Sequence, residues 1–201
     1  MKLYFKPGAC SLASHIILNE IGLDHQIEQV DTDTKQTQSG QDYLKINPKG
    51  YVPALELETG EVLSEGASIL QYLAEQGTDF YAPKSGTIEK ARIQEHLNYT
   101  ASELHKAFGP FFSAAATDAD KEKAGKQVAT KFDYVESLLA DGRDYLLGQD
   151  FSVADAYLFV VSNWANFVNI DLANWPNLSE FVQRVAGRAA TQKAMAAEGL
   201  V

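Results

Sequence analysis

The chain has 201 residues, with 17 Lys and Arg against 27 Asp and Glu, so its formal net charge is −10 at pH 7. This length fits one large domain or two small ones, and a hydrophobic content of 45% is typical of a chain that folds. The single cysteine, Cys10, excludes an internal disulfide framework and a cysteine-type zinc cluster. The acidic charge argues against nucleic-acid binding, because phosphates would be repelled.

The sequence carries no targeting or membrane signal. The N-terminal run is interrupted by Lys6 and Pro7, so it lacks the apolar core of a signal peptide. The longest uncharged stretch, 156–170, has 15 residues, whereas a bilayer span needs about 20. We therefore expect a cytoplasmic protein with no membrane partner.

The first 80 residues alternate between strand and helix patterns. Glycines and short polar segments separate these elements, which favours a compact α/β unit. The expected strands are 2–6, 27–30, 52–57 and 61–63, the last two forming a hairpin, and the expected helices are 11–22 and 64–76.

The segment 77–86 contains two glycines and a proline without hydrophobic periodicity, and it predicts a domain boundary. The expected domains are 1–80 and 87–201, joined by a linker at 81–86. Apolar residues beyond the linker recur at helical spacing, so the second domain is predicted to be all-α. Its expected helices cover three long stripes, within 93–108, 128–139 and 153–168, and two shorter segments, 178–186 and 191–197.

Cys10 lies where the first strand gives way to the first helix. The free N–H groups of a helix N-terminus favour a thiolate, so this placement is compatible with a lowered cysteine pKa. A small apolar residue at a tight turn is an equally good interpretation. Ala13 stands where a dithiol oxidoreductase has its second cysteine, so an active Cys10 would need an external thiol.

Two further segments could bind a ligand, although ordinary structural roles are more common for each. The Val52-Pro53 bond, at the entry to a strand, is a candidate for the cis isomer, which would leave the Val52 backbone free to pair with an extended peptide. Glu65 and the free N–H groups of Gly66 and Ala67 open a helix and form a site of mixed charge. Ser64 is the expected helix cap.

The acidic charge is concentrated in the first domain. Residues 1–80 contain 5 Lys, no Arg and 12 acidic residues, so their net charge is 5 − 12 = −7. Lys35 and Lys49 are rare cations there and are candidate anion contacts.

The four histidines lack the spacing of metal ligands, and we expect no metal site. Asn98, Ser102 and His105 recur at helical spacing and form one polar stripe, which is either a solvated face or a functional one turned toward Cys10. Ser152 and Asp155 form a capping-box pattern that we interpret as structural.

Several motifs in this order and spacing resemble the glutathione transferases, specifically the bacterial beta class, along essentially the whole chain. The matching segments are Met1-Lys2-Leu3-Tyr4, Lys6-Pro7-Gly8-Ala9-Cys10-Ser11, Asn47-Pro48-Lys49-Gly50-Tyr51-Val52-Pro53-Ala54-Leu55, Leu63-Ser64-Glu65-Gly66, Leu97-Asn98-Tyr99, Glu103-Leu104-His105 and Phe151-Ser152-Val153-Ala154-Asp155-Ala156-Tyr157.

The resemblance implies a thioredoxin-like N-terminal domain, an all-helical C-terminal domain, a homodimer and glutathione as co-substrate. It makes Cys10 and His105 the catalytic residues beside the glutathione sulfur, with a mixed disulfide at Cys10 as one state of this class. Lys35 would reach the glycyl carboxylate and Val52 the cysteinyl backbone. The full set of implied glutathione contacts is Ala9, Cys10, Lys35, Val52, Pro53, Glu65, Gly66, Asn98, Ser102, Glu103 and His105.

One position departs from the family pattern. Many glutathione transferases have serine after the acidic residue, whereas Gly66 has no hydroxyl, so the γ-glutamyl carboxylate would depend on backbone N–H groups. Tyr4 is expected to be core or pocket wall. Four aromatic residues are candidates for the acceptor pocket, although core positions suit them better: Phe108, Phe112, Tyr157 and Trp164.

The expected activity is conjugation of the glutathione thiolate to electrophilic apolar acceptors, as in detoxification. One alternative is a glutathione-dependent disulfide reductase that uses Cys10 as its single nucleophile. The other is a non-catalytic binding scaffold, which would not need Cys10, Glu65 and His105 together.

Overall fold

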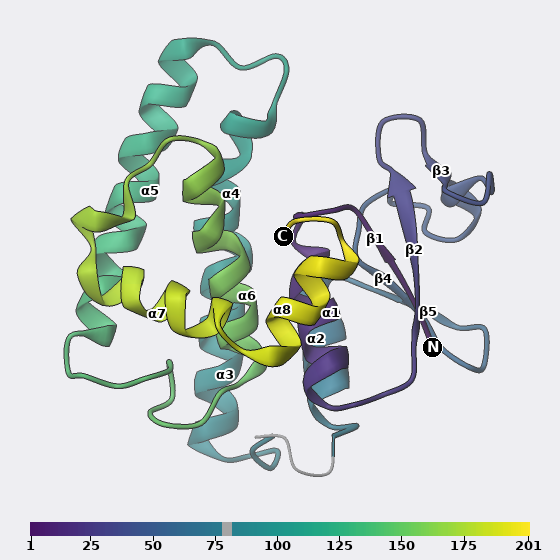
Figure 1. Ribbon diagram of the computed structural model, residues 1–201, viewed down its shortest axis with the longest axis horizontal. Helices are drawn as coiled ribbons and strands as arrows, with labels where there is room; N and C mark the ends of the chain where they lie inside the picture. Colours follow the sequence, from purple (N-terminus) through teal and green to yellow (C-terminus); the bar gives the residue numbers. More distant parts are fainter. Residues whose placement is uncertain (78–81) are drawn as a thin grey trace. The chain divides into compact units, whose positions relative to one another are not determined.

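The computed structural model describes residues 1–77 and 82–201 (Figure 1). The chain forms two compact units, Met1–Ala82 with Gly187–Val201, and Pro83–Ala186. The C-terminal residues 187–201 thus group with the first unit, whereas the sequence places them in the helical domain. The predicted linker 81–86 begins at Tyr81, which lies outside the described residues.

The first unit contains a five-stranded mixed sheet with the order β3-β2-β1-β4-β5. Its strands are β1 Lys2–Phe5, β2 Gln26–Asp31, β3 Gln36–Thr37, β4 Ala54–Glu56 and β5 Val62–Ser64. β1 and β2 are parallel, and the other pairs are antiparallel. The predicted strands and hairpin are confirmed, whereas the two-residue β3 is too short for an alternating pattern to indicate it.

Three helices of this unit lie on one side of the sheet, namely α1 Ser11–Glu20, α2 Gly66–Ala74 and α8 Ala189–Ala197 (Figure 1). α1 is the central one, since it packs against both α2 and α8 and its residues from Ser11 to Leu18 are all buried. The guanidinium of Arg188, which precedes α8, pairs with Glu20 at 2.6 Å. α8 is therefore part of the layer that sets the position of α1.

The opposite side of the sheet carries a smaller core. Tyr4, Val30, Tyr43 and Ala54 are all buried in one cluster. Tyr43 comes from the 3₁₀ helix Tyr43–Lys45, and its hydroxyl donates to the carbonyl of Tyr51 at 2.8 Å. This cluster fixes the loop that leads into β4.

The second unit is helical, as predicted. Its α-helices are α3 Ile88–Tyr99, α4 His105–Phe108, α5 Asp118–Leu139, α6 Val153–Asn163 and α7 Pro176–Ala186, with a π-helical segment at Thr100–Leu104 and 3₁₀ turns at Gly109–Phe112, Trp164–Phe167 and Leu172–Asn174. α6 is buried from Val153 to Ser162, which confirms it as the central helix expected from its apolar sequence. None of the described helices is long and apolar enough to cross a membrane.

Candidate active site

Cys10 is the N-terminal cap residue of α1, as the sequence predicts, and it is half-buried. Its thiol donates to the carbonyl oxygen of Val52, with Sγ and O 3.4 Å apart. The next residue, Ser11, is buried, and its hydroxyl bonds with the backbone of Lys6. The turn between β1 and α1 is thus fixed by the bonds of Ser11 to Lys6 and by the bond of Cys10 to Val52, and it sets the position of the sulfur.

The pKa of the Cys10 thiol is raised to about 11, mainly because burial disfavours the charged form. Backbone hydrogen bonds from Cys10 and Ser11 lower this pKa, but they do not offset burial, and the charge of Glu65 raises it further. Of the two interpretations of Cys10 that the sequence leaves open, the lowered pKa is therefore contradicted. At neutral pH Cys10 is a thiol, and it is not an activated nucleophile by itself.

The Val52-Pro53 peptide bond is cis, which confirms the isomer expected from the sequence. The preceding loop is well anchored, because the carbonyl of Tyr51 accepts hydrogen bonds from the Tyr43 hydroxyl and from Asn47 Nδ2, each at 2.8 Å. The ammonium of Lys35 donates to the Gly50 carbonyl at 3.0 Å. Lys35 therefore lies against the loop that presents Val52.

The start of α2 places Glu65 and Gly66 near the Val52-Pro53 segment. A Cβ atom added at Gly66 would lie 3.7 Å from the Pro53 ring, so the two predicted binding segments lie next to each other. Glu65, not Ser64, is the cap residue of α2, and Ser64 instead ends β5. The Glu65 side chain makes no capping bond, and its carboxylate pairs with the Lys49 ammonium at 2.6 Å.

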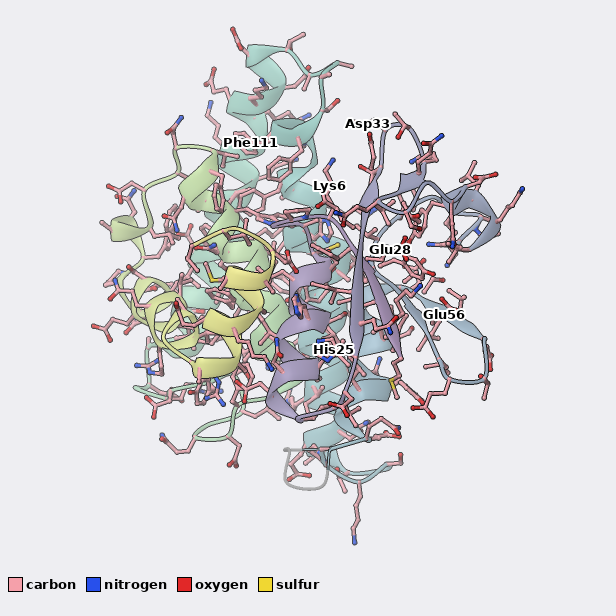
Figure 2. The ribbon with its side chains drawn as sticks, turned by 45° about the vertical axis from the view of Figure 1, so that its right-hand side comes forward. Lys6, His25, Glu28, Asp33, Glu56 and Phe111 are labelled. Carbon is pink, nitrogen blue, oxygen red and sulfur yellow. The ribbon has the colours of Figure 1, made fainter. Side chains whose placement is uncertain are left out.

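Tyr4 does not take part in this site. Its hydroxyl donates to the Glu56 carboxylate at 2.7 Å, and Figure 2 shows Glu56 and Glu28 on the side of the sheet away from α1. Burial and the bond to Glu56 raise the pKa of Tyr4 further above its usual value. Tyr4 is a neutral core residue, which confirms its expected structural role.

A buried polar network supports the turn that carries Cys10. The carboxylate of Glu198, at the end of α8, contacts His15 Nδ1 on α1 at 3.0 Å and accepts the Gly8 amide N–H at 3.0 Å. Since a carboxylate only accepts, His15 Nδ1 is the donor. Gly8 has a φ of +69°, a conformation that suits glycine. Sequence reasoning missed this network because its members are separated by up to 190 residues.

In the second unit, the predicted polar stripe is divided by the π-helical segment. Because a π-helix closes its hydrogen bonds five residues apart, residues after it lie at a different angle around the axis from those of a continuous α-helix. Asn98 and Ser102 are exposed, and the Ser102 hydroxyl donates to the Asn98 carbonyl at 2.8 Å. Glu103 is exposed and pairs with Lys131 on α5. His105 is half-buried and contacts α6.

His105 Nδ1 lies 2.9 Å from the Tyr157 hydroxyl, and the imidazole meets the Trp164 ring edge-on with centroids 4.8 Å apart. Burial, and to a smaller extent the charge of Lys106, lower the pKa of His105 to about 4. The imidazole is therefore neutral at neutral pH. A neutral imidazole that accepts a hydrogen bond from the Tyr157 hydroxyl at Nδ1 carries its N–H proton on Nε2.

We expect the His105 imidazole to titrate near pH 4 in the folded chain, against about 6.5 when unfolded. Between these pH values only the unfolded chain binds this proton, so the stabilisation from neutral His105 is lost as the pH falls through this window. A pH titration of the His105 NMR signal, assigned with the His105→Gln variant, measures this pKa directly. A midpoint near 6.5 would show that the side chain is solvated.

The four predicted acceptor-pocket aromatics form one cluster around Trp164. The rings of Phe108 and Phe112 lie 5.7 and 5.3 Å from it, and His105 links it to Tyr157. Phe108 is fully buried and so is a core residue, whereas the side chain of Phe112 is 56% exposed. Phe111, labelled in Figure 2, also belongs to the cluster, since its ring packs against Phe108. Its place next to Phe112 is the only feature of the sequence that could have indicated this.

Among residues 1–77 and 82–201, no group of three or more His, Cys, Asp or Glu side chains could hold a metal ion. The first unit brings together the Cys10 thiol, the Val52 carbonyl and the N-terminus of α2. Its charged groups are the Glu65 carboxylate and the ammonium groups of Lys35 and Lys49. The second unit holds a neutral imidazole beside an aromatic cluster. The thiol and the charged groups of the first unit suit a small peptide with a thiol and charged ends.

Comparisons with known proteins agree with this chemistry. The family models of the N-terminal and C-terminal domains of glutathione S-transferase match residues 8–76 and 99–189. The chain belongs to the glutathione S-transferase family, with the thioredoxin-like N-terminal domain and all-helical C-terminal domain that the resemblance implies.

The similar proteins also indicate the class. The chain is 45% identical to glutathione S-transferase GstA of Escherichia coli O157:H7, over 100% of both chains. The solved structure of the bacterial beta class glutathione S-transferase of Sphingomonas chungbukensis is 42% identical, with a TM-score of 0.96 over 100% of both chains. A ternary complex of BphK, a bacterial glutathione transferase, is 49% identical with the same TM-score and coverage. These similarities place the chain with the bacterial beta class.

Proposed function

We propose that this chain is a glutathione transferase that directs the glutathione thiolate onto electrophilic apolar acceptors, as in detoxification. The observation that carries the proposal is that Cys10 bonds to the Val52 carbonyl while the start of α2 lies next to Pro53, all within the first unit. A γ-glutamyl ammonium would pair with Glu65, the cysteinyl backbone with Val52, and the glycyl carboxylate with Lys35. Lys35 would leave the Gly50 carbonyl to do so.

The glutathione thiol first loses its proton to water. In the reaction, the resulting thiolate sulfur forms a bond to the electrophilic carbon, and the leaving group departs with the electron pair of the broken bond. The Cys10 thiol would turn from the Val52 carbonyl to the glutathione sulfur. It and the Nε2–H of neutral His105 would then donate hydrogen bonds that stabilise the thiolate, without being consumed. Ala9, Pro53, Gly66, Asn98, Ser102 and Glu103 would complete the contacts with glutathione. The Trp164 cluster would supply apolar surface to the acceptor.

The test is retention on immobilised glutathione together with conjugation of chlorodinitrobenzene, followed by absorbance. We expect retention that free glutathione reverses, and turnover that depends on glutathione. A chain that is not retained and does not turn over would contradict the proposal. Size-exclusion chromatography with light scattering tests the homodimer, and cell fractionation tests the cytoplasmic location, both of which belong to this proposal.

We expect Cys10→Ala to keep conjugation within about tenfold of the unchanged chain, because the nucleophile is the sulfur of glutathione and the Cys10 thiol has a pKa of about 11. Reduction of a glutathione mixed disulfide needs a protein thiolate, so any such activity of the unchanged chain should be lost in the same variant. Loss of conjugation by a hundredfold or more would instead identify Cys10 as essential.

A further inference from the structure

The carboxylate that the proposed function assigns to the γ-glutamyl ammonium is occupied by an ammonium group of the chain itself. Lys49 Nζ lies 2.6 Å from Glu65 Oε1 and 3.0 Å from Ser64 Oγ. Lys49 stands in the loop before the cis Val52-Pro53 bond, and Glu65 is the cap residue of α2. The loop and the helix are thus joined by one ion pair at the place where the ligand end would bind.

This ion pair is open to solvent, since the side chains of Lys49 and Glu65 are 50% and 66% exposed. An exposed pair of this kind adds little to the stability of a protein, because water screens the two charges. A ligand can therefore separate the two groups at little cost, and both can turn toward it.

The γ-glutamyl end of glutathione carries an ammonium and a carboxylate on one carbon atom, so its two charges match those of Glu65 and Lys49. When the ligand ammonium takes Glu65, Lys49 loses its partner beside the ligand carboxylate. Gly66, the first residue of α2, supplies only a backbone N–H there. In a segment with a net charge of −7, a second cation is the group that this carboxylate lacks.

We propose that Lys49 determines specificity for the γ-glutamyl end, by exchanging its ammonium from Glu65 to the α-carboxylate of the bound ligand. The inference rests on the proposed function and assigns to Lys49 the role that a serine hydroxyl at position 66 would have. Lys49 acts in binding and takes no part in the bond-forming step.

Isothermal titration calorimetry tests the exchange. Lys49→Met should weaken glutathione binding about five- to tenfold, the effect of losing one charge-assisted contact, whereas Lys49→Arg should stay within about twofold. Lys45→Met is the matched control, because it removes an equal charge from an exposed position of the same unit. It should leave the affinity unchanged.

Two truncated ligands distinguish the contribution of the α-carboxylate to binding from that of the ammonium. With glutaryl-cysteinylglycine, which keeps the carboxylate, Lys49→Met should still weaken binding, but by less than with glutathione, because no ligand ammonium displaces Lys49 from Glu65. With γ-aminobutyryl-cysteinylglycine, which keeps only the ammonium, the loss should vanish. An equal loss with both ligands, or glutathione binding to Lys49→Met that is as tight as or tighter than to the unchanged chain, would overturn the inference.

A second variant tests the comparison with serine. A Cβ at position 66 would meet the Pro53 ring at ordinary contact distances of 3.7 and 3.9 Å, so Gly66→Ser fits. Adding it to Lys49→Met should restore part of the lost affinity, and a double variant without recovery contradicts the assigned role. If the unchanged chain does not bind glutathione, the proposed function fails as well, whereas binding without an effect of Lys49→Met overturns this inference alone.

Discussion

Replacing Glu198 by alanine is expected to destabilise the first unit by about 3 kcal/mol, because it removes one partner of a buried polar pair. The Glu198 and His15 side chains are 0% and 3% exposed. Without the carboxylate, His15 Nδ1–H loses its acceptor, and the Gly8 amide loses the bond that ties it to α8. The turn that carries Cys10 should therefore loosen together with the end of α8.

Hydrogen exchange followed by mass spectrometry measures this effect where it arises. Protection of the peptide around Gly8 should fall in Glu198→Ala, and Glu198→Gln should lie between, since its amide oxygen can replace one of the two carboxylate oxygens. Glu58→Ala, at an exposed position, is the control for the lost charge. Unchanged protection around Gly8 would show that the network does not hold the turn.

Local patterns were enough to predict much of the fold. The hairpin of β4 and β5 pairs as expected, because a short turn with a glycine separates its two strands. The place of α8 could not be predicted, because its packing on α1 depends on Arg188 and Glu198 meeting partners from the first 20 residues. Nothing in the local sequence of a short helix indicates such distant contacts.

In the candidate site too, local features could be predicted from the sequence, whereas features that depend on the surrounding fold could not. The glycine, the prolines and the position of Cys10 indicate where the backbone turns, and the structure has these turns. The ionisation of Cys10 and His105 could not be predicted, since it depends on burial, which raises one pKa and lowers the other. Asn98, Ser102 and His105 do not form the single polar stripe that was predicted, because helical spacing assumes a continuous α-helix across the π-helical segment Thr100–Leu104.

Asp155→Ala is expected to destabilise the second unit by about 3 kcal/mol, because three buried donors lose one acceptor. Asp155 accepts from the Leu146 amide at 2.7 Å and from the amide and hydroxyl of Ser152 at 2.9 and 2.6 Å. Burial raises its pKa to about 6 although these bonds lower it, so the carboxylate is charged at neutral pH. It fixes both the start of the central helix α6 and the loop before it.

The chain offers a matched control for this prediction in α5. Thr117 and Asp120 form the same capping box, with 2.9 and 2.6 Å bonds to the Asp120 carboxylate, but at an exposed site. Asp120→Ala should therefore cost about 1 kcal/mol, the usual effect of losing an exposed cap. Both tryptophans, Trp164 and Trp175, belong to the second unit, so their fluorescence during urea unfolding measures its stability. Equal losses in the two variants would show that burial adds nothing to the Asp155 cap.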